Sequence, residues 1–198
     1  MVVDRLYSGT IAERFSNVNM IVGCGDLPNE YLEFLVSAMN VPLLYVPGNH
    51  DPAYNRKLVS TYAQGGEFLD LKFSRVHGLN IAGFGGSMRY RPCCANQYSQ
   101  SQMYSRMASF IPRLLWNLSR NGGKLDIVIA HSPPKGIHDD NDLAHTGFSA
   151  FRDFIKYFRP RYFLHGHTMA YRNNVAPEIT MLGTTAVINV NPYRIIEV

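Results

Sequence analysis

The segment that most constrains this chain is the hexapeptide at 46–51, Val-Pro-Gly-Asn-His-Asp, which follows a run of strand-forming residues. Taken alone, its polar residues could simply cap the following turn. Three more short apolar runs end in a similar manner, on Asp26, on His131 and on the His-Gly-His triplet at 165–167. In an open α/β sheet, ligands bind beyond the carboxyl ends of the strands. We therefore expect these four strand ends to meet at one edge.

Length and composition favour one α/β domain spanning residues 1–198. The chain has 198 residues and 46% hydrophobic content, enough for a sizeable core, and its strand and helix patterns alternate. The net charge of +4 without a basic run is compatible with a small anionic substrate and argues against a nucleic-acid partner. Three cysteines, two of them adjacent, do not indicate a disulfide framework, and no apolar run reaches membrane-spanning length. We expect a cytoplasmic protein without membrane association.

Hydrophobic periodicity predicts the order of the elements. Strands at 18–24 and 41–46 flank a helix that begins near Pro28, and together they form a β-α-β unit. A long helix at 97–120 should be kinked or restarted at Pro112, and a second amphipathic helix covers 148–158. The remaining strands are expected at 68–73, 80–84, 125–130, 162–164, 184–190 and 193–198.

The side chains at the strand ends are typical of a metal site. A carboxylate oxygen, an amide oxygen and imidazole nitrogens suit a divalent ion such as Mn²⁺, Fe²⁺ or Zn²⁺. Each candidate also has an ordinary explanation: a helix cap, a turn residue, or a hydrogen-bonded core histidine. All four at strand ends, in this order, are hard to obtain by chance. The predicted metal ligands are Asp26, Asn49, His131 and His167.

These motifs resemble those of the calcineurin-like metallophosphoesterases. The resemblance rests on Gly25-Asp26, the Gly-Asn-His-Asp at 48–51, His131 after an apolar strand, and the Gly-His-Thr at 166–168. It implies an αββα sandwich carrying a two-metal centre. In that centre Asp26 would bridge the two ions, and the other three predicted ligands would hold the second ion. His50 would stabilise the phosphoryl oxygens or protonate the leaving group, and Asp51 would orient His50.

Two departures from the family pattern affect the first metal. The family carries an Asp-x-His at the end of an N-terminal strand, whereas here Asp4 is followed by Arg and Leu and no strand is predicted. The family's last motif is Gly-His-x-His, whereas this chain has Met169 at the final position. A thioether replaces imidazole poorly on Mn²⁺ or Fe²⁺. We therefore expect a fold that lacks the N-terminal strand and binds one divalent ion (Mn, Fe or Zn) tightly.

The leading interpretation is a metal-dependent phosphoesterase, a hydrolase of a small phosphomonoester or phosphodiester, that uses a metal-activated water and has a degraded first metal site. The alternative is a catalytically silent domain that serves as a binding scaffold. Met169 favours the scaffold, while His50 and Asp51 favour the enzyme. Two further points stay open at this level: the oligomeric state, and whether His138 faces the substrate or belongs to a solvated surface loop.

Overall fold

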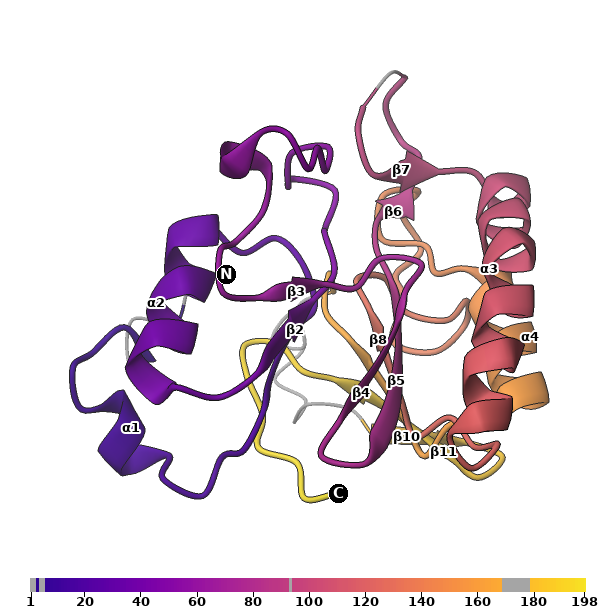
Figure 1. The fold of residues 1–198 in the computed structure, drawn as a ribbon. Helices are drawn as coiled ribbons and strands as arrows, with labels where there is room; N and C mark the ends of the chain where they lie inside the picture. Colours follow the sequence, from indigo (N-terminus) through magenta and orange to yellow (C-terminus); the bar gives the residue numbers. More distant parts are fainter. Residues whose placement is uncertain (1–2, 4–5, 93, 169–178) are drawn as a thin grey trace.

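The computed structural model describes residues 3, 6–92, 94–168 and 179–198 and shows four layers (Figure 1). Helices α1 (Ile11–Arg14) and α2 (Asn29–Met39) cover one side of a three-stranded sheet. A six-stranded sheet packs against its other side and is covered in turn by α3 (Gln100–Arg120) and α4 (Ser149–Phe158). This is the αββα sandwich that the sequence predicts. Within the described ranges, no helix is both long and apolar enough to cross a membrane.

The three-stranded sheet has the order β1-β2-β3 and is parallel throughout. Its strands are short: β1 (Ile21–Gly23), β2 (Leu43–Tyr45) and β3 (Glu67–Phe68). Helix α2 connects β1 to β2 and completes the predicted β-α-β unit. It ends at Asn40, which has a left-handed backbone and whose N–H donates to the carbonyl of Val36. No strand precedes β1 among residues 3 and 6–20, so β1 lies at the edge of the sheet.

The six-stranded sheet has the order β10-β11-β9-β8-β5-β4. Its four central strands are mutually parallel, and the strands at its two edges are antiparallel to their neighbours. The strands are β4 (Phe73–Val76), β5 (Leu79–Phe84), β8 (Ile127–Ala130), β9 (Tyr162–His165), β10 (Ile179–Leu182) and β11 (Thr185–Asn189). A separate parallel pair, β6 (Ser87–Met88) and β7 (Gln97–Tyr98), carries a projecting loop, and a 3-10 turn, η2, covers Val59–Thr61.

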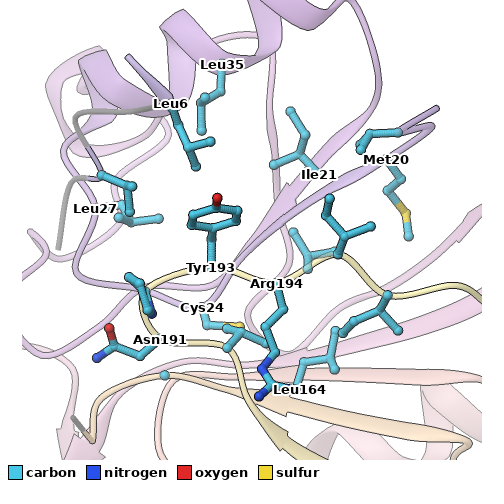
Figure 2. Close-up of a pocket in the computed structure, with 18 of the residues that line it drawn as sticks. Leu6, Met20, Ile21, Cys24, Leu27, Leu35, Leu164, Asn191, Tyr193 and Arg194 are labelled. Atoms are coloured by element: carbon cyan, nitrogen blue, oxygen red, sulfur yellow. The ribbon is translucent and has the colours of Figure 1, made fainter. Parts of the chain in front are cut away.

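Some sequence predictions differ from the structure in detail. Helix α3 continues through Pro112, so the restart considered there does not occur; Pro112 lies on the exposed face, where water can replace the backbone bond that proline cannot make. The strand predicted at 68–73 is divided between the end of β3 and the start of β4. Residues 193–198 form no strand. They instead run as an extended tail in which Tyr193 and Arg194 point to opposite sides (Figure 2).

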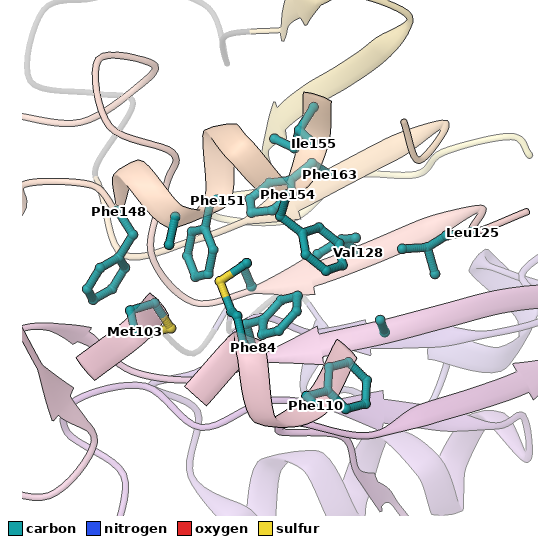
Figure 3. Close-up of a cluster of buried hydrophobic side chains, with 14 of the residues drawn as sticks. Phe84, Met103, Phe110, Leu125, Val128, Phe148, Phe151, Phe154, Ile155 and Phe163 are labelled. Atoms are coloured by element: carbon teal, nitrogen blue, oxygen red, sulfur yellow. The ribbon is translucent and has the colours of Figure 1, made fainter. Parts of the chain in front are cut away.

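The core is divided between the layers. Apolar side chains of both sheets, among them Val46, Ile129 and Leu164, form a cluster between them. The largest cluster in the described residues lies between the six-stranded sheet and α3 and α4, where Phe84 and Phe151 are fully buried (Figure 3). Two smaller clusters lie on the α1 and α2 side. The sandwich thus holds the ends of β1, β2, β8 and β9 at one edge, where the candidate site lies.

Candidate metal centre

Two turns that follow β1 and β2 are fastened together. The Asp51 carboxylate oxygen Oδ2 accepts hydrogen bonds from the backbone N–H of Gly48 at 2.7 Å and of Asp26 at 2.9 Å. In return, Asp26 Oδ1 accepts one from the backbone N–H of His50 at 2.9 Å. Burial raises the pKa of Asp51, and the two backbone hydrogen bonds oppose that rise. The two turns therefore form one unit.

Glycine is required where these turns touch. A Cβ on Gly48 would collide with the Asp26 carboxylate. At Gly25, which has a φ of +86°, a Cβ would lie 2.5 Å from the Gly48 nitrogen and 2.5 Å from His131 Nδ1. Asp26 itself has a φ of 56°, a left-handed conformation that aspartate tolerates better than most residues. The Gly-Asp and Gly-Asn motifs thus reflect close backbone approach as well as chemistry.

His131, which follows β8, has a defined tautomer. Its ring is fully buried, and Nδ1 lies 2.7 Å from the carbonyl oxygen of Cys24. Because a carbonyl oxygen can only accept, Nδ1 must carry a hydrogen, and in this tautomer of a neutral ring Nε2 is an acceptor. Nε2 faces two more acceptors: Asn49 Oδ1 at 3.0 Å and Asp26 Oδ2 at 3.5 Å.

The Asn49 amide and the His167 ring are oriented by their outer partners. Asn49 Nδ2 donates to the hydroxyl of Tyr90 at 3.2 Å, which turns Oδ1 toward His131. His167 Nε2 donates to the carbonyl oxygen of Ala144 at 2.8 Å, which leaves Nδ1 with the free lone pair. Burial, followed by the neighbouring His131, lowers the pKa of His167 to about 4, so its ring is neutral near pH 7.

These side chains converge on one position. Asp26, His131 and His167 each offer a ligand atom, and these atoms lie within 4.8 Å of one another, with Asn49 Oδ1 beside His131. Lone pairs that face each other repel unless a positive charge lies between them. The mixed oxygen and nitrogen donor set suits a divalent ion such as Mn²⁺, Fe²⁺ or Zn²⁺. The residues present therefore fit a metal ion.

The other predicted site residues are placed differently. His50 is exposed next to the ligand set. Asp51 Oδ2 accepts hydrogen bonds from the turn backbone and so positions Asp26 and Gly48. The orientation of the His50 ring by Asp51 stays a prediction. Asp4 and Met169, on which the degraded first site depends, lie outside the described residues.

His138 is half-buried and contacts other protein groups, so it is not part of a fully solvated surface loop. Its Nδ1 lies 2.9 Å from His165 Nε2, and its Nε2 lies 2.9 Å from Thr180 Oγ1. Both ring nitrogens therefore face protein atoms, and the pair joins the loop 131–147 to β9 and β10. Burial lowers the pKa of His165 to about 3, which keeps that ring neutral. The same loop contains Ala144, which orients His167.

Sequence reasoning missed Tyr90 and the carbonyl groups of Cys24 and Ala144. Tyr90 lies in the loop between β6 and β7, 41 residues from Asn49, and no motif marks it. Every residue has a backbone carbonyl, so the residue type does not indicate which carbonyls will accept these bonds. The one available signal is that a ligating histidine usually donates its second nitrogen to a carbonyl or carboxylate.

Comparison with known proteins agrees with this geometry. Residues 5–171 match the family described as calcineurin-like phosphoesterase. The match covers most of the chain, and the protein belongs to this family of metal-dependent phosphoester hydrolases. It is 24% identical over 187 residues to the uncharacterized protein MJ1162 of Methanocaldococcus jannaschii. The aligned region covers 88% of this chain and 78% of that protein.

Solved structures show the same fold at low identity. TT1561 of Thermus thermophilus is 19% identical with a TM-score of 0.59, over 92% of this chain and 80% of its own. A second crystal structure is also 19% identical, with a TM-score of 0.63, over 92% of this chain and 82% of its own. These likenesses establish the architecture of the chain.

Proposed function

We propose that the protein hydrolyses a small phosphomonoester or phosphodiester and holds one tightly bound divalent ion, for which Mn²⁺, Fe²⁺ and Zn²⁺ are the candidates. The ligands would be Asp26, Asn49, His131 and His167. The observation that carries the proposal is the meeting of His131 Nε2 with Asn49 Oδ1 at 3.0 Å and Asp26 Oδ2 at 3.5 Å, three atoms that can act as metal ligands when His131 Nδ1 donates to the Cys24 carbonyl.

The chain itself keeps these lone pairs directed inward. A bound divalent ion would supply positive charge against the phosphoryl oxygens and lower the pKa of a bound water. The carbonyls of Cys24 and Ala144 hold the tautomers of His131 and His167, and Tyr90 holds the Asn49 amide. Such outer partners are worth about 10- to 100-fold in metal affinity or activity.

We further propose that His50 is the acid of the reaction. Water adds to phosphorus, the phosphorus–oxygen ester bond breaks, and the departing oxygen needs a proton. His50 is exposed beside the ligand set, and its backbone is fixed by Asp26. A general acid contributes about 10²- to 10⁴-fold. That benefit is largest for leaving groups that are poor without protonation.

The degraded first site is also part of the proposal. It rests on the sequence, where Met169 stands in place of a histidine and no Asp-x-His is present. Two-metal catalysis depends on both ions acting on the same reacting oxygens. We therefore expect weak hydrolysis with one ion per chain, and only partial improvement in Met169→His.

Metal analysis together with hydrolysis of bis(p-nitrophenyl) phosphate in Mn²⁺ tests the main proposal. The unaltered protein should retain one ion per chain after gel filtration and turn over slowly. His131→Ala should lose the ion and the activity, while His77→Ala, an exposed histidine that contacts Asn19, should keep both. Two tightly held ions would contradict the degraded site. One ion without any hydrolysis would support the scaffold alternative.

The role of His50 is tested by varying the leaving group. His50→Gln should slow phenyl esters far more than p-nitrophenyl esters, because p-nitrophenolate leaves without protonation. An equal loss for both esters would show that His50 acts on the phosphoryl oxygens or on the structure instead.

A further inference from the structure

A cavity of about 330 Å³ opens from the candidate metal centre into the interior. Its lining includes Asp26, His131 and His167. Most of the other lining residues are apolar, among them Ile21 of β1 and Leu35 of α2 (Figure 2). The candidate metal ligands and an apolar lining thus border one continuous space.

Three walls enclose the apolar part. Helix α2 contributes Leu35 and Met39, and the six-stranded sheet contributes Ile127 and Leu164. The extended tail closes the third side, with Tyr193 turned toward Leu35 (Figure 2). Among the side chains of the described lining residues, those of Arg194 and Asp26 are the ones that carry a formal charge at neutral pH. An uncharged, apolar group would meet few polar partners to displace.

The size and lining of this space are those of a small-ligand site. Ligand pockets span about 300–1,000 Å³, are mostly apolar, and hold a few convergent polar groups that set the orientation. The volume here is at the lower end of that range, and the convergent polar groups are the proposed metal ligands. A phosphoryl group placed at those ligands would direct its ester substituent into the apolar part.

A protein segment is the competing occupant, because β1 has one edge without a strand partner among the described residues. However, the space is continuous with a centre that suits an anion, because Asp26, His131 and His167 contribute to its lining. This continuity favours a small amphiphilic molecule.

We propose that the substrate is a phosphoester whose ester group is an apolar chain or ring small enough to fill this cavity. This proposal deepens the proposed phosphoesterase function and rests on it. Affinity should rise with the length of the apolar group until the cavity is full and then stop rising.

Binding of straight-chain alkylphosphonates, which cannot be hydrolysed, tests the proposal separately from turnover. Dissociation constants are measured by calorimetry for methyl- to octylphosphonate, with and without Mn²⁺. Each added methylene should lower Kd by about fourfold, equivalent to about 0.8 kcal/mol, until a plateau. Mn²⁺ should strengthen the whole series without changing its slope. Affinity that rises with chain length but without any turnover would contradict the proposed phosphoesterase function and support the apolar binding site. Turnover without a dependence of affinity on chain length would contradict the binding site and leave the phosphoesterase function standing.

Variants locate the binding space. Leu35→Trp should fill the cavity and abolish the chain-length dependence, and Met39→Trp offers the same change at a half-buried position if the first variant folds poorly. Leu115→Trp, on the exposed face of α3, should behave as the unaltered protein. A slope that persists in both cavity variants would overturn the proposal. A second combination of results would also overturn it: no chain-length dependence in the unaltered protein, together with a lowered Tm in Leu35→Trp and Met39→Trp but not in Leu115→Trp. That combination would show that protein side chains already fill the space.

Discussion

The two helix–sheet halves of the sandwich are packed very differently. Between the six-stranded sheet and α3 and α4, aromatic rings interlock: Phe84 lies with ring centroids 5.0 Å from Phe154 and 5.6 Å from Phe151. On the other side, the clusters around α1 and α2 are small and border the cavity of about 330 Å³. One half supplies a rigid platform, and the other half leaves space beside the candidate site.

The strands that support the candidate site reflect this contrast. Every residue of β8 is buried, while Ile21 and Val22 of β1 remain partly exposed. The site nevertheless draws on both halves, since Asp26 and Asn49 follow the three-stranded sheet and His131 and His167 follow the six-stranded one. Stability and binding space are thus separated within one fold. The three predictions that follow test that separation.

The largest expected effect is on the packed half. Phe84→Ala removes a fully buried ring and should lower the unfolding free energy by about 3–5 kcal/mol. Leu35→Ala should cost only about 2 kcal/mol, at the low end for this substitution, because Leu35 already borders a cavity and loses fewer contacts. Urea unfolding of the metal-free variants measures both. Equal losses would mean that the two halves are packed alike.

Acidic pH should lower the unfolding free energy through His165, the last residue of β9, and His167, which follows it closely. The folded-state pKa of His167 is lowered to about 4, so below about pH 6.5 the unfolded chain binds a proton that the folded chain does not. Stability therefore falls as pH drops from about 6.5 toward 4, by about 3 kcal/mol for this residue at roughly 1.4 kcal/mol per pKa unit. His165, with a pKa of about 3, extends the loss to lower pH.

Urea unfolding of metal-free protein between pH 7 and 4.5 tests this effect. His167→Gln should lose less stability over that interval, while His77→Ala, in the turn between β4 and β5, should lose as much as the unaltered protein. The same loss in all three proteins would assign the acid effect to other groups.

The smallest expected effect contrasts the helix starts of the two halves. Helix α3 begins with a capping box in which Ser99 accepts from the Gln102 backbone and the Gln102 side chain accepts from the Ser99 backbone. Ser99→Ala should cost about 1 kcal/mol. Thr10 precedes α1 without a side-chain cap, so Thr10→Ala should be nearly neutral. A thermal melt resolves this difference, and comparable losses would show that α1 is capped in solution.

The sequence predicts the strand ends well because their residues carry both chemistry and backbone constraint. Gly25 and Gly48 permit the close approach, and Asp26 and Asn49 follow them directly. The apolar runs before them have the pattern of buried strands, so the β-α-β unit and the edge where the four ends meet follow from periodicity and topology.

What the sequence misses depends on contacts between distant segments. Residues 193–198 have a strand-like pattern, but a strand also needs a neighbour to pair with, and the tail borders the cavity instead. The loop position of Tyr90 and the His138–His165 contact arise from tertiary packing, which local patterns do not encode. The Asp51 contacts likewise run to backbone amides, which any residue type would present.

The fastening by Asp51 has a consequence for how the site can change size. The turns after β1 and β2 are joined by the carboxylates of Asp26 and Asp51, and His131 bonds to the backbone of the first of them. His167 is anchored instead to the loop 131–147. A larger ion would therefore be accommodated by a shift of this loop, not by rotation of single side chains. The position of the loop would then depend on the radius of the bound ion. Mutations at the contacts of His138 with His165 and Thr180 would in that case alter metal selectivity without touching a ligand.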